Sequence, residues 1–435
     1  MVNARTEKMS TGVDWLGEIP KHWNVCSLKR VLSEPLKYGA TEAGDCDDRS
    51  LPRYLRITDF DNDGGLRADT FVSLPEEIAR NYYLTEGDVL FARSGATVGK
   101  TFLFRNYQGQ ACFAGYLVKA SPARHKLRPE FLYYFTKSLA YEAWKDFIFT
   151  QATIQNIGAD KYAYLPVCLP SIEEQQQIAA YLDASCASIN AAVAAKSRQI
   201  DILDALRKST VTRAVTRGLN SLALLRHTDV PWIPEAPKHW RVVRLKDVME
   251  FFNTVRVPLS AAERGLMTAR TYDYYGASGV IDKVEAYLFD GTYILIAEDG
   301  ANLLTRSKPL AFLATGKFWV NNHAHILKPR WQGDDTFFVN LLESQDYSLF
   351  VTGAAQPKLT MENLGRFKLA LPPVEEQREI AGFIREKDAA FRTLSTGIER
   401  QIDTLVAYRK SLIHECVTGQ RRISEADLNR EKAHG

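Results

Sequence analysis

The feature that most constrains this chain is an internal repeat. The segment Trp15–Val31 recurs 217 residues later as Trp232–Val248, and ten of the 17 aligned positions are identical, including Pro-Lys-His-Trp in both copies. A second pair, Leu169–Ala179 and Leu371–Ala381, lies 202 residues apart and carries Glu-Glu-Gln in both copies. A fixed frame therefore occurs twice, whereas the residues between the matched segments differ in sequence and, by 15 residues (217 against 202), in length.

The repeat predicts two modules that alternate with two long helices. The predicted parts are an N-terminal tail at 1–14, module 1 at 15–168, a central helical region at 169–218, module 2 at 219–370, a C-terminal helical region at 371–420 and a C-terminal tail at 421–435. Each module mixes short strands with helices, so the expected fold class is α+β, with two mixed α/β modules separated by helices. Trp23 and Trp240, which both copies keep, are expected to anchor the modules on the helices.

Each predicted helix has clear ends. After Pro170 or Pro372 it begins with two glutamates, which suit the positive end of a helix dipole, and Gly218 or Gly419 is expected to end it. Apolar side chains at steps of three and four predict a coiled-coil seam. The seam residues are Ile178, Leu182, Ile189, Leu203, Ile380, Ile384, Phe391, Leu394 and Leu405. Two equivalent helices pack most simply antiparallel about a pseudo-two-fold axis, and a generic helical bundle is the alternative.

Composition permits several functions and excludes few. The net charge of +3, from 55 basic and 52 acidic residues, allows nucleic-acid binding without requiring it. The six cysteines contain no Cys-x-x-Cys pair, which favours reduced thiols in a cytoplasm over a disulfide framework or a zinc site. The sequence contains no continuous run of about 18 apolar residues, so no membrane span is predicted. The N-terminal residues lack the apolar run of a secretion signal.

Module 1 contains a loop that resembles a phosphate-binding loop but departs from its spacing. Strands are predicted at Tyr54–Asp59 and Asp88–Arg93, and Ser94–Thr101 follows the second. Only three residues separate Gly95 from Gly99, where a P-loop has four, and no helical pattern follows. Nucleotide binding is therefore disfavoured. A polar, glycine-rich loop suits a sugar–phosphate backbone, and a plain strand connection without a partner is the alternative.

Module 2 carries polar residues at the end of a predicted strand. The apolar strand Tyr293–Ala297 ends in Glu298–Asn302, and Asn321–His325 follows it in the sequence. Two histidines at i and i+2 can form part of a metal site, but no third ligand has suitable spacing, so no metal is predicted. A structural role, or base recognition by the amides, is the favoured interpretation.

The polar loops of both modules supply the candidate contacts to DNA. Gln151–Asn156 and Gly353–Lys358 occupy equivalent places before the exit strand of each module. The full candidate set is Arg56, Arg93, Ser94, Thr97, Lys100, Thr153, Gln155, Asn156, Arg256, Tyr274, Tyr275, Ser278, Asn302, Arg306, Asn322, His323, Gln356 and Lys358. No catalytic residue is predicted, because no base-methylation, helicase, nuclease or dinucleotide-binding motif is present in the sequence.

The motifs and their order resemble one family. Trp15–Trp23, Ala92–Lys100, Leu169–Gln175, Tyr275–Ile281, Ile296–Asn302 and Asn321–His325 are similar to segments of the specificity subunit of type I restriction–modification systems. The resemblance covers the chain except both tails. One departure is Leu206 in the central region, at the position that Tyr408 occupies in the second copy.

The resemblance implies a non-catalytic DNA-binding subunit in the cytoplasm. Each module would be a target recognition domain for one half of a bipartite double-stranded DNA site. The helices, ~65–70 Å long at ~1.5 Å per residue, would set the spacer between the half-sites. The resemblance also implies that the helical regions, with the seam residues named above, dock the methylation subunits. The expected partners are two methylation subunits and two motor–nuclease subunits, which would carry S-adenosylmethionine, ATP and Mg²⁺, with no cofactor in this chain and no membrane. The alternative is a coiled-coil scaffold whose two modules bind peptides or proteins.

Overall fold

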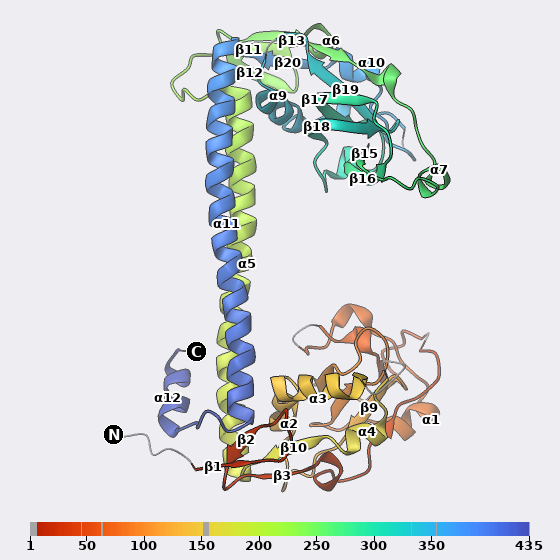
Figure 1. Cartoon of the computed structure of the whole chain (residues 1–435), viewed down its shortest axis with the longest axis vertical. Helices are drawn as coiled ribbons and strands as arrows, with labels where there is room; N and C mark the ends of the chain where they lie inside the picture. The colour runs from red at the N-terminus through yellow and green to blue at the C-terminus, as the bar shows by residue number, and fades with distance from the viewer. Residues whose placement is uncertain are drawn as a thin grey trace. The chain divides into compact units, whose positions relative to one another are not determined.

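The computed structural model describes residues 7–434 except 45, 62–63, 151–155, 332 and 354. The chain divides into two compact units (Figure 1). Unit 1 comprises residues 1–197 and 399–435, and unit 2 comprises residues 198–398. The long helices α5 (Ile172–Arg217) and α11 (Val374–Val417) each contribute one part to each unit. The predicted helical regions are thus single continuous helices, divided between the units.

Unit 1 is built on short strands. A four-stranded sheet has the order β4-β9-β6-β7, and β5 pairs in parallel with β8 beside it. The strands of unit 1 are β1 (Lys8–Ser10), β2 (Glu18–Pro20), β3 (Asn24–Ser27), β4 (Lys37–Tyr38), β5 (Arg53–Leu55), β6 (Val89–Ala92), β7 (Thr101–Leu103), β8 (Ala111–Phe113), β9 (Leu117–Ala120) and β10 (Pro166–Leu169). Its shorter helices are α1 (Glu76–Ala79), α2 (Pro129–Phe135), α3 (Leu139–Thr150), α4 (Ala159–Ala163) and α12 (Glu425–His434).

Unit 2 has a larger, six-stranded mixed sheet with the order β14-β19-β17-β18-β15-β16. The strands of unit 2 are β11 (Leu225–Val230), β12 (Ile233–Pro237), β13 (Arg241–Arg244), β14 (Met249–Phe251), β15 (Tyr272–Gly276), β16 (Gly279–Val284), β17 (Phe289–Ala297), β18 (Ala311–Val320), β19 (Ala324–Pro329) and β20 (Lys368–Leu371). Its shorter helices are α6 (Leu245–Val248), α7 (Ala261–Gly265), α8 (Asn302–Thr305), α9 (Asp335–Glu343) and α10 (Met361–Arg366). Short 3-10 helices span Leu28–Arg30, Ile57–Asp59, Ala68–Thr70, Arg80–Tyr82, Asn253–Val255 and Ser348–Phe350.

The strand predictions were correct in position but not in extent. The strand predicted at Tyr54–Asp59 ends at Leu55, because Ile57–Asp59 turns into a 3-10 helix that the buried carboxylate of Asp59 closes on the backbone of Arg56. The strand predicted at Asp88–Arg93 is β6, and the strand predicted at Tyr293–Ala297 is the second half of β17.

The repeated segments form the same frame in both units. In unit 1 the entry strand β3 pairs antiparallel with the exit strand β10, and in unit 2 β13 pairs in the same way with β20. A helix then packs between each sheet and the long helices: α2 in unit 1 and α9 in unit 2 (Figure 1). The frame closes each module at its start and its end, while the sheet between these strands differs between the two units.

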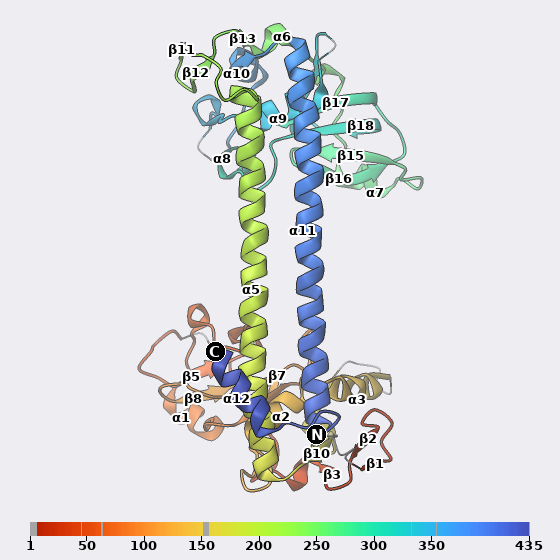
Figure 2. The same ribbon diagram turned by 90° about the vertical axis from the view of Figure 1, so that its left-hand side faces the viewer.

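The two long helices pack side by side within each unit (Figure 2). In unit 1 the beginning of α5, at Ile178 and Leu182, shares a core with the end of α11, at Leu412 and Cys416. In unit 2 the end of α5 shares a core with the beginning of α11, at Ile380 and Ile384. The start of one helix meets the end of the other in both units, so the pairing is antiparallel, as the repeat predicts.

One seam residue was assigned wrongly. Ile178, Leu182, Ile189, Ile380 and Ile384 are buried. Leu203, Phe391 and Leu405 are half-buried, whereas the side chain of Leu394 is 54% exposed. The half-buried positions after Phe391, as far as Leu405, are 395–398, 402 and 405. Of these, 395, 398, 402 and 405 continue from Phe391 in steps of three and four, so Ser395 occupies the seam and Leu394 lies beside it.

Helix α5 also meets a length and composition criterion for a membrane span. It contains an 18-residue window of mean hydropathy 1.3, of which 39% is buried within this chain. The helix carries Asp183, which pairs with Arg105 and Tyr134 of module 1. Within unit 1 the beginning of this helix packs against module 1 and α11.

Candidate nucleic-acid interface

A duplicated contact fixes each module on the helix pair. The indole Nε1 of Trp23 donates to Glu174 in the first turn of α5 at 3.1 Å, and that of Trp240 donates to Glu376 in the first turn of α11 at 3.2 Å. Both indoles are 1% exposed. The neighbouring His22 and His239 contact the same two glutamates, at 3.2 Å and 2.7 Å. The predicted anchoring role of the two tryptophans is confirmed.

The two helix-ending glycines complete this contact. Gly419, with φ of +71°, ends α11 so close to Pro20 that a Cβ atom would lie 2.3 Å from the proline Cδ. Gly218, with φ of +76°, ends α5 against Glu376 and Trp240. A left-handed backbone and a close approach both require glycine. Each tryptophan therefore sits where one long helix begins and the other ends.

The glutamine of the repeated Glu-Glu-Gln motif has a separate task. The amide of Gln175 is fully buried, donates to the carbonyls of Pro170 and Lys126 at 3.0 Å, and accepts from the backbone of Arg128. Gln377 donates to Pro372 in the equivalent place. The motif was visible as a repeat, but its function of joining helix and module required the structure.

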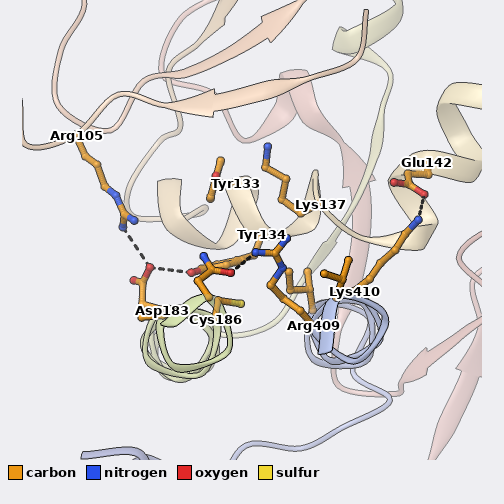
Figure 3. A pocket seen from close by; sticks show the side chains of 13 residues that line it. Arg105, Tyr133, Tyr134, Lys137, Glu142, Asp183, Cys186, Arg409 and Lys410 are labelled. Atoms are coloured by element: carbon orange, nitrogen blue, oxygen red, sulfur yellow. Dashed lines mark hydrogen bonds and ion pairs between the residues drawn. The ribbon is translucent and has the colours of Figure 1, made fainter. Parts of the chain in front are cut away.

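Further contacts hold module 1 on both long helices around a cavity of about 360 Å³. Arg105 and Tyr134 both reach Asp183 on α5, at 3.2 Å and 2.8 Å, and Lys410 on α11 reaches Glu142 on α3 at 2.6 Å (Figure 3). These contacts orient the module relative to the part of the helix pair within its own unit.

Lys137 lies beside this cavity and donates to the carbonyl of Thr101 at 2.7 Å. Burial, together with the charges of Lys100 and Arg409, lowers the pKa of Lys137 to about 8. In the unfolded chain Lys137 keeps its proton up to its ordinary pKa of 10.5, whereas in the folded chain it loses the proton above about pH 8. Below pH 8 the buried charge therefore lowers the free energy of unfolding, and this destabilisation disappears as the pH rises towards 10.5. We expect Lys137→Met to raise the thermal stability of unit 1 at pH 7 and to flatten its rise between pH 8 and 10.5. Calorimetry across pH measures this, with the exposed Lys126→Met as control; an unchanged pH profile would contradict it.

Backbone hydrogen bonds show which loop positions of unit 1 and unit 2 are equivalent, although the loop sequences differ. The amide of Arg93 donates to the carbonyl of Tyr116 at 3.0 Å, and the amide of Glu298 donates to that of His323 at 2.9 Å. Ile157 then donates to the carbonyl of Arg93 as Leu359 does to that of Glu298. Isolated bridges join Ser94 to Asn156 in unit 1 and Asp299 to Lys358 in unit 2. Four positions are therefore equivalent: Arg93 and Glu298, Ser94 and Asp299, Tyr116 and His323, Asn156 and Lys358.

These positions define two loop clusters. Loop cluster 1 comprises residues 38–44, 93–97, 114–116 and 156–158 of unit 1. Loop cluster 2 comprises residues 253–259, 298–302, 321–323 and 352–358, without 354, of unit 2. Each cluster lies at the end of the central strand of its sheet, β6 or β17, where loops that are distant in the sequence meet.

Loop cluster 1 surrounds a cavity of about 590 Å³. Three sequence candidates, Arg56, Arg93 and Ser94, line it together with Glu42 and Tyr116. The guanidinium of Arg93 lies over the ring of Tyr38 at 4.7 Å, and no ion pair to Arg93 occurs among the described residues. Arg56 is held differently, by an ion pair to the buried Asp59 at 3.1 Å, so part of its hydrogen-bonding capacity serves the fold.

The loop that resembles a phosphate-binding loop is a hairpin. Strand β6 pairs antiparallel with β7, and the turn between them uses Gly95 and Gly99 with φ of +78° and +82°. Strand β7 follows this turn where a P-loop would be followed by a helix. Thr97 and Lys100 lie in this turn, with the side chain of Lys100 exposed.

Loop cluster 2 has a buried carboxylate at its centre, where loop cluster 1 has an arginine. Glu298 is 8% exposed and pairs with Arg256 at 2.5 Å and with Lys358 at 3.3 Å. Burial opposes its ionisation, yet the hydrogen bond from Arg256 and the surrounding positive charge hold the pKa of Glu298 below its ordinary value. The site candidates Arg256 and Lys358 are thus gathered around one acid that sequence reasoning did not select.

His325 belongs to the fold of this cluster. Burial lowers the pKa of His325, which favours the neutral ring. Its Nε2 then donates to the carbonyl of Leu359 at 2.7 Å, and its Nδ1 accepts from the amide of Asn253 at 2.7 Å. His323 lies before the start of β19, and its ring contacts Asp299. The two histidines therefore do not lie on one face of a strand. The described residues contain no group of three or more potential metal ligands.

Several candidates support the fold rather than project from it. Tyr274 is 1% exposed and bonds the backbone of Leu259, so its assignment as a DNA contact is corrected. Arg306 adopts a left-handed conformation and donates to the carbonyls of Glu343 and Gln345. Asn302 holds the turn to Lys308 through both its amide atoms. Their polarity predicts contacts to DNA, but these side chains make hydrogen bonds within unit 2.

The remaining candidates keep exposed or half-exposed positions. Tyr275 stacks on Phe312 at 6.0 Å, and Ser278 is exposed in the turn between β15 and β16. Asn322 and Gln356 are exposed in loop cluster 2. Thr153 and Gln155 lie outside the described residues.

The fold and the loop clusters define a class: a duplicated protein that presents two different sets of side chains on one repeated frame. The family model for the type I restriction modification DNA specificity domain matches residues 37–200 and 237–404. This chain therefore belongs to the family of type I restriction–modification DNA specificity proteins.

Individual relatives agree with the family. The chain is 22% identical over 419 residues to a putative type I restriction enzyme specificity subunit of Methanocaldococcus jannaschii, which covers 94% of this chain and 96% of that protein. It is 31% identical over 157 residues to a putative specificity subunit of Haemophilus influenzae, with 36% of this chain and 37% of that protein covered. A solved structure concerned with assembly of a type I restriction–modification system matches with a TM-score of 0.69 at 15% identity, covering 93% of this chain and 99% of that one.

Proposed function

We propose that this chain is the DNA-specificity subunit of a type I restriction–modification complex, and that each loop cluster recognises one half of a bipartite DNA site. The observation that carries the proposal is the duplicated frame with unlike contents. Arg93 in one unit and Glu298 in the other occupy the same backbone position, so the same architecture carries unlike side chains. Two modules that bound the same ligand would not need this difference.

The long helices would set the spacer and dock the methylation subunits. At ~1.5 Å per residue a helix of about 46 residues is ~70 Å long, which exceeds one DNA turn of ~34 Å. Leu206 and Tyr408 occupy equivalent positions 202 residues apart and are 52% and 50% exposed. An exposed apolar side chain at the equivalent position of both units supports docking of two copies of one partner. The buried seam residues cannot contact a partner in the same way.

The chemistry would belong to the partners. Two methylation subunits would bind S-adenosylmethionine, and two motor–nuclease subunits would use ATP and Mg²⁺ in the cytoplasm. This chain would supply sequence recognition alone, without a cofactor or a catalytic residue. Clamping of the phosphate backbone can then be shared with the partners, which fits the small net charge of +3.

The test is a base-resolution map of methylated sites produced by the complex assembled with its methylation subunit. We expect one split sequence, and exchange of residues 30–168 for another module should alter one half-site and leave the other unchanged. DNA affinity of the assembled complex should fall steeply with salt. A scaffold with peptide-binding modules would give neither result, and a single contiguous methylated sequence would contradict the two-module proposal.

A further inference from the structure

Tyr116 is a large aromatic side chain in loop cluster 1 that the fold does not bury. Its side chain is 68% exposed, and it lines the cavity of about 590 Å³ beside Arg93 and Ser94. An isolated exposed aromatic residue needs no explanation. Tyr116 is different because the backbone on both sides of it is fixed.

Three backbone contacts hold Tyr116 in place. Its carbonyl accepts from the amide of Arg93 at 3.0 Å, Gly115 donates to Ala40 at 2.6 Å, and Leu117 donates to Ala114 at 2.9 Å. A Cβ atom at Gly39 would lie 2.2 Å from the carbonyl oxygen of Phe113, so the two loops touch backbone to backbone. The loop is therefore a rigid support, and rigid aromatic side chains bind ligands with little loss of conformational entropy.

His323 occupies the same position in loop cluster 2 and is also exposed, at 46% of its side-chain area. Both carboxylate oxygens of Asp299 lie 2.9 Å from its Nδ1, and the side chain of Asn321 accepts from its backbone amide at 2.8 Å. Asp299 therefore orients the ring so that the Nε2 edge is the one left for a ligand. A second polar aromatic ring is thus held in place, with different hydrogen-bonding chemistry.

We infer that Tyr116 and His323 are a pair of specificity-determining residues, each of which contacts a base edge in its own half-site. This inference rests on the proposed function. The phenol presents a hydroxyl group that can donate and accept a hydrogen bond, whereas the imidazole, whose Nδ1 faces Asp299, presents its Nε2 edge. The same position would therefore favour different bases in the two halves of the site.

The experiment uses the full chain assembled with its methylation subunit. Tyr116→Phe removes only the hydroxyl and Tyr116→Ala removes the ring, while His323→Gln keeps a polar partner for Asp299. Methylation maps and affinities for DNA substituted at single positions are measured for each variant. Tyr164→Ala, at 63% exposure outside the loop cluster, and His227→Ala, in exposed strand β11, are the matched controls.

We expect the Tyr116 variants to lose about tenfold of their discrimination at one position of one half-site, and His323→Gln to do the same in the other half. The control variants should keep the parental map. Exchange of the two residues, by Tyr116→His with His323→Tyr, should change the preferred base in both halves. This double variant keeps an aromatic ring at each position, so it tests the inference even where the alanine variant is less stable.

Other outcomes overturn the inference. Equal weakening on all sequences, with a smaller salt dependence, would mean a phosphate contact in place of base recognition. An unchanged map for every variant would mean that neither side chain contacts the bases. The proposed function fails separately, because then the parental complex itself would give no bipartite map.

Discussion

Trp240→Ala should lower the free energy of unfolding of unit 2 by about 3–5 kcal/mol, the cost of removing a large buried aromatic side chain. The indole is 1% exposed and belongs to a core that joins the entry strand, the exit strand and the beginning of α11. Its Nε1 proton also satisfies Glu376, which would lose that partner. Trp23→Ala should have the same effect on unit 1, because the contact is duplicated.

Calorimetry of the full chain is the measurement, with hydrogen exchange to assign each loss of protection to a unit. Trp331, which is 40% exposed in unit 2, is the matched control, and its alanine variant should change stability by less than about 1 kcal/mol. Glu376→Gln should cost about 1 kcal/mol, since it weakens the contact without opening a cavity. If Trp240→Ala were no worse than Trp331→Ala, the anchor would be a surface contact and the packing argument would be wrong.

The frame could be predicted from the sequence because its residues interact locally or are repeated. Periodic apolar residues, first-turn glutamates and terminal glycines fixed α5 and α11 to within a few residues. The phase of the seam was harder. Leu394 is more apolar than Ser395, but helix geometry, and not polarity, places position 395 in the seam. An isolated sequence cannot show which of two adjacent positions faces a partner.

The candidate site was only partly predictable, because its residues meet through loops that are distant in the sequence. The polarity of Arg93 and Lys358 predicts them as site residues, but it does not single out Glu298, whose ion pairs join Arg256 and Lys358 in loop cluster 2. The equivalence of Tyr116 with His323 depends on two backbone hydrogen bonds and leaves no trace in side-chain identity. Polarity alone also selected Tyr274, whose ring is buried. The burial of each side chain and the backbone pairing of the loops depend on the tertiary structure, so the sequence alone does not give them.

Glu298→Ala should be the most damaging single change in loop cluster 2. The side chain of Arg256 is 14% exposed and would lose its carboxylate, and Lys358 and the buried His325 would lose the negative charge beside them. Removal of one partner from a buried ion pair typically costs about 3–5 kcal/mol, because the remaining charge is left without compensation. Arg256 keeps the carbonyl of Ala324 at 2.7 Å, so we expect the lower end, about 3 kcal/mol.

The pH dependence of this loss has a definite sign. The pKa of Glu298 is lower in the folded chain, so its stabilising contribution is present above the ordinary glutamate pKa and is lost as the pH falls through the folded value. Glu298→Gln should therefore remove part of the acid sensitivity of unit 2, while the exposed Glu285→Gln should not. In the assembled complex, Glu298→Ala should abolish recognition of one half-site and spare the other. Loss of both halves together would show that the two loop clusters do not act independently.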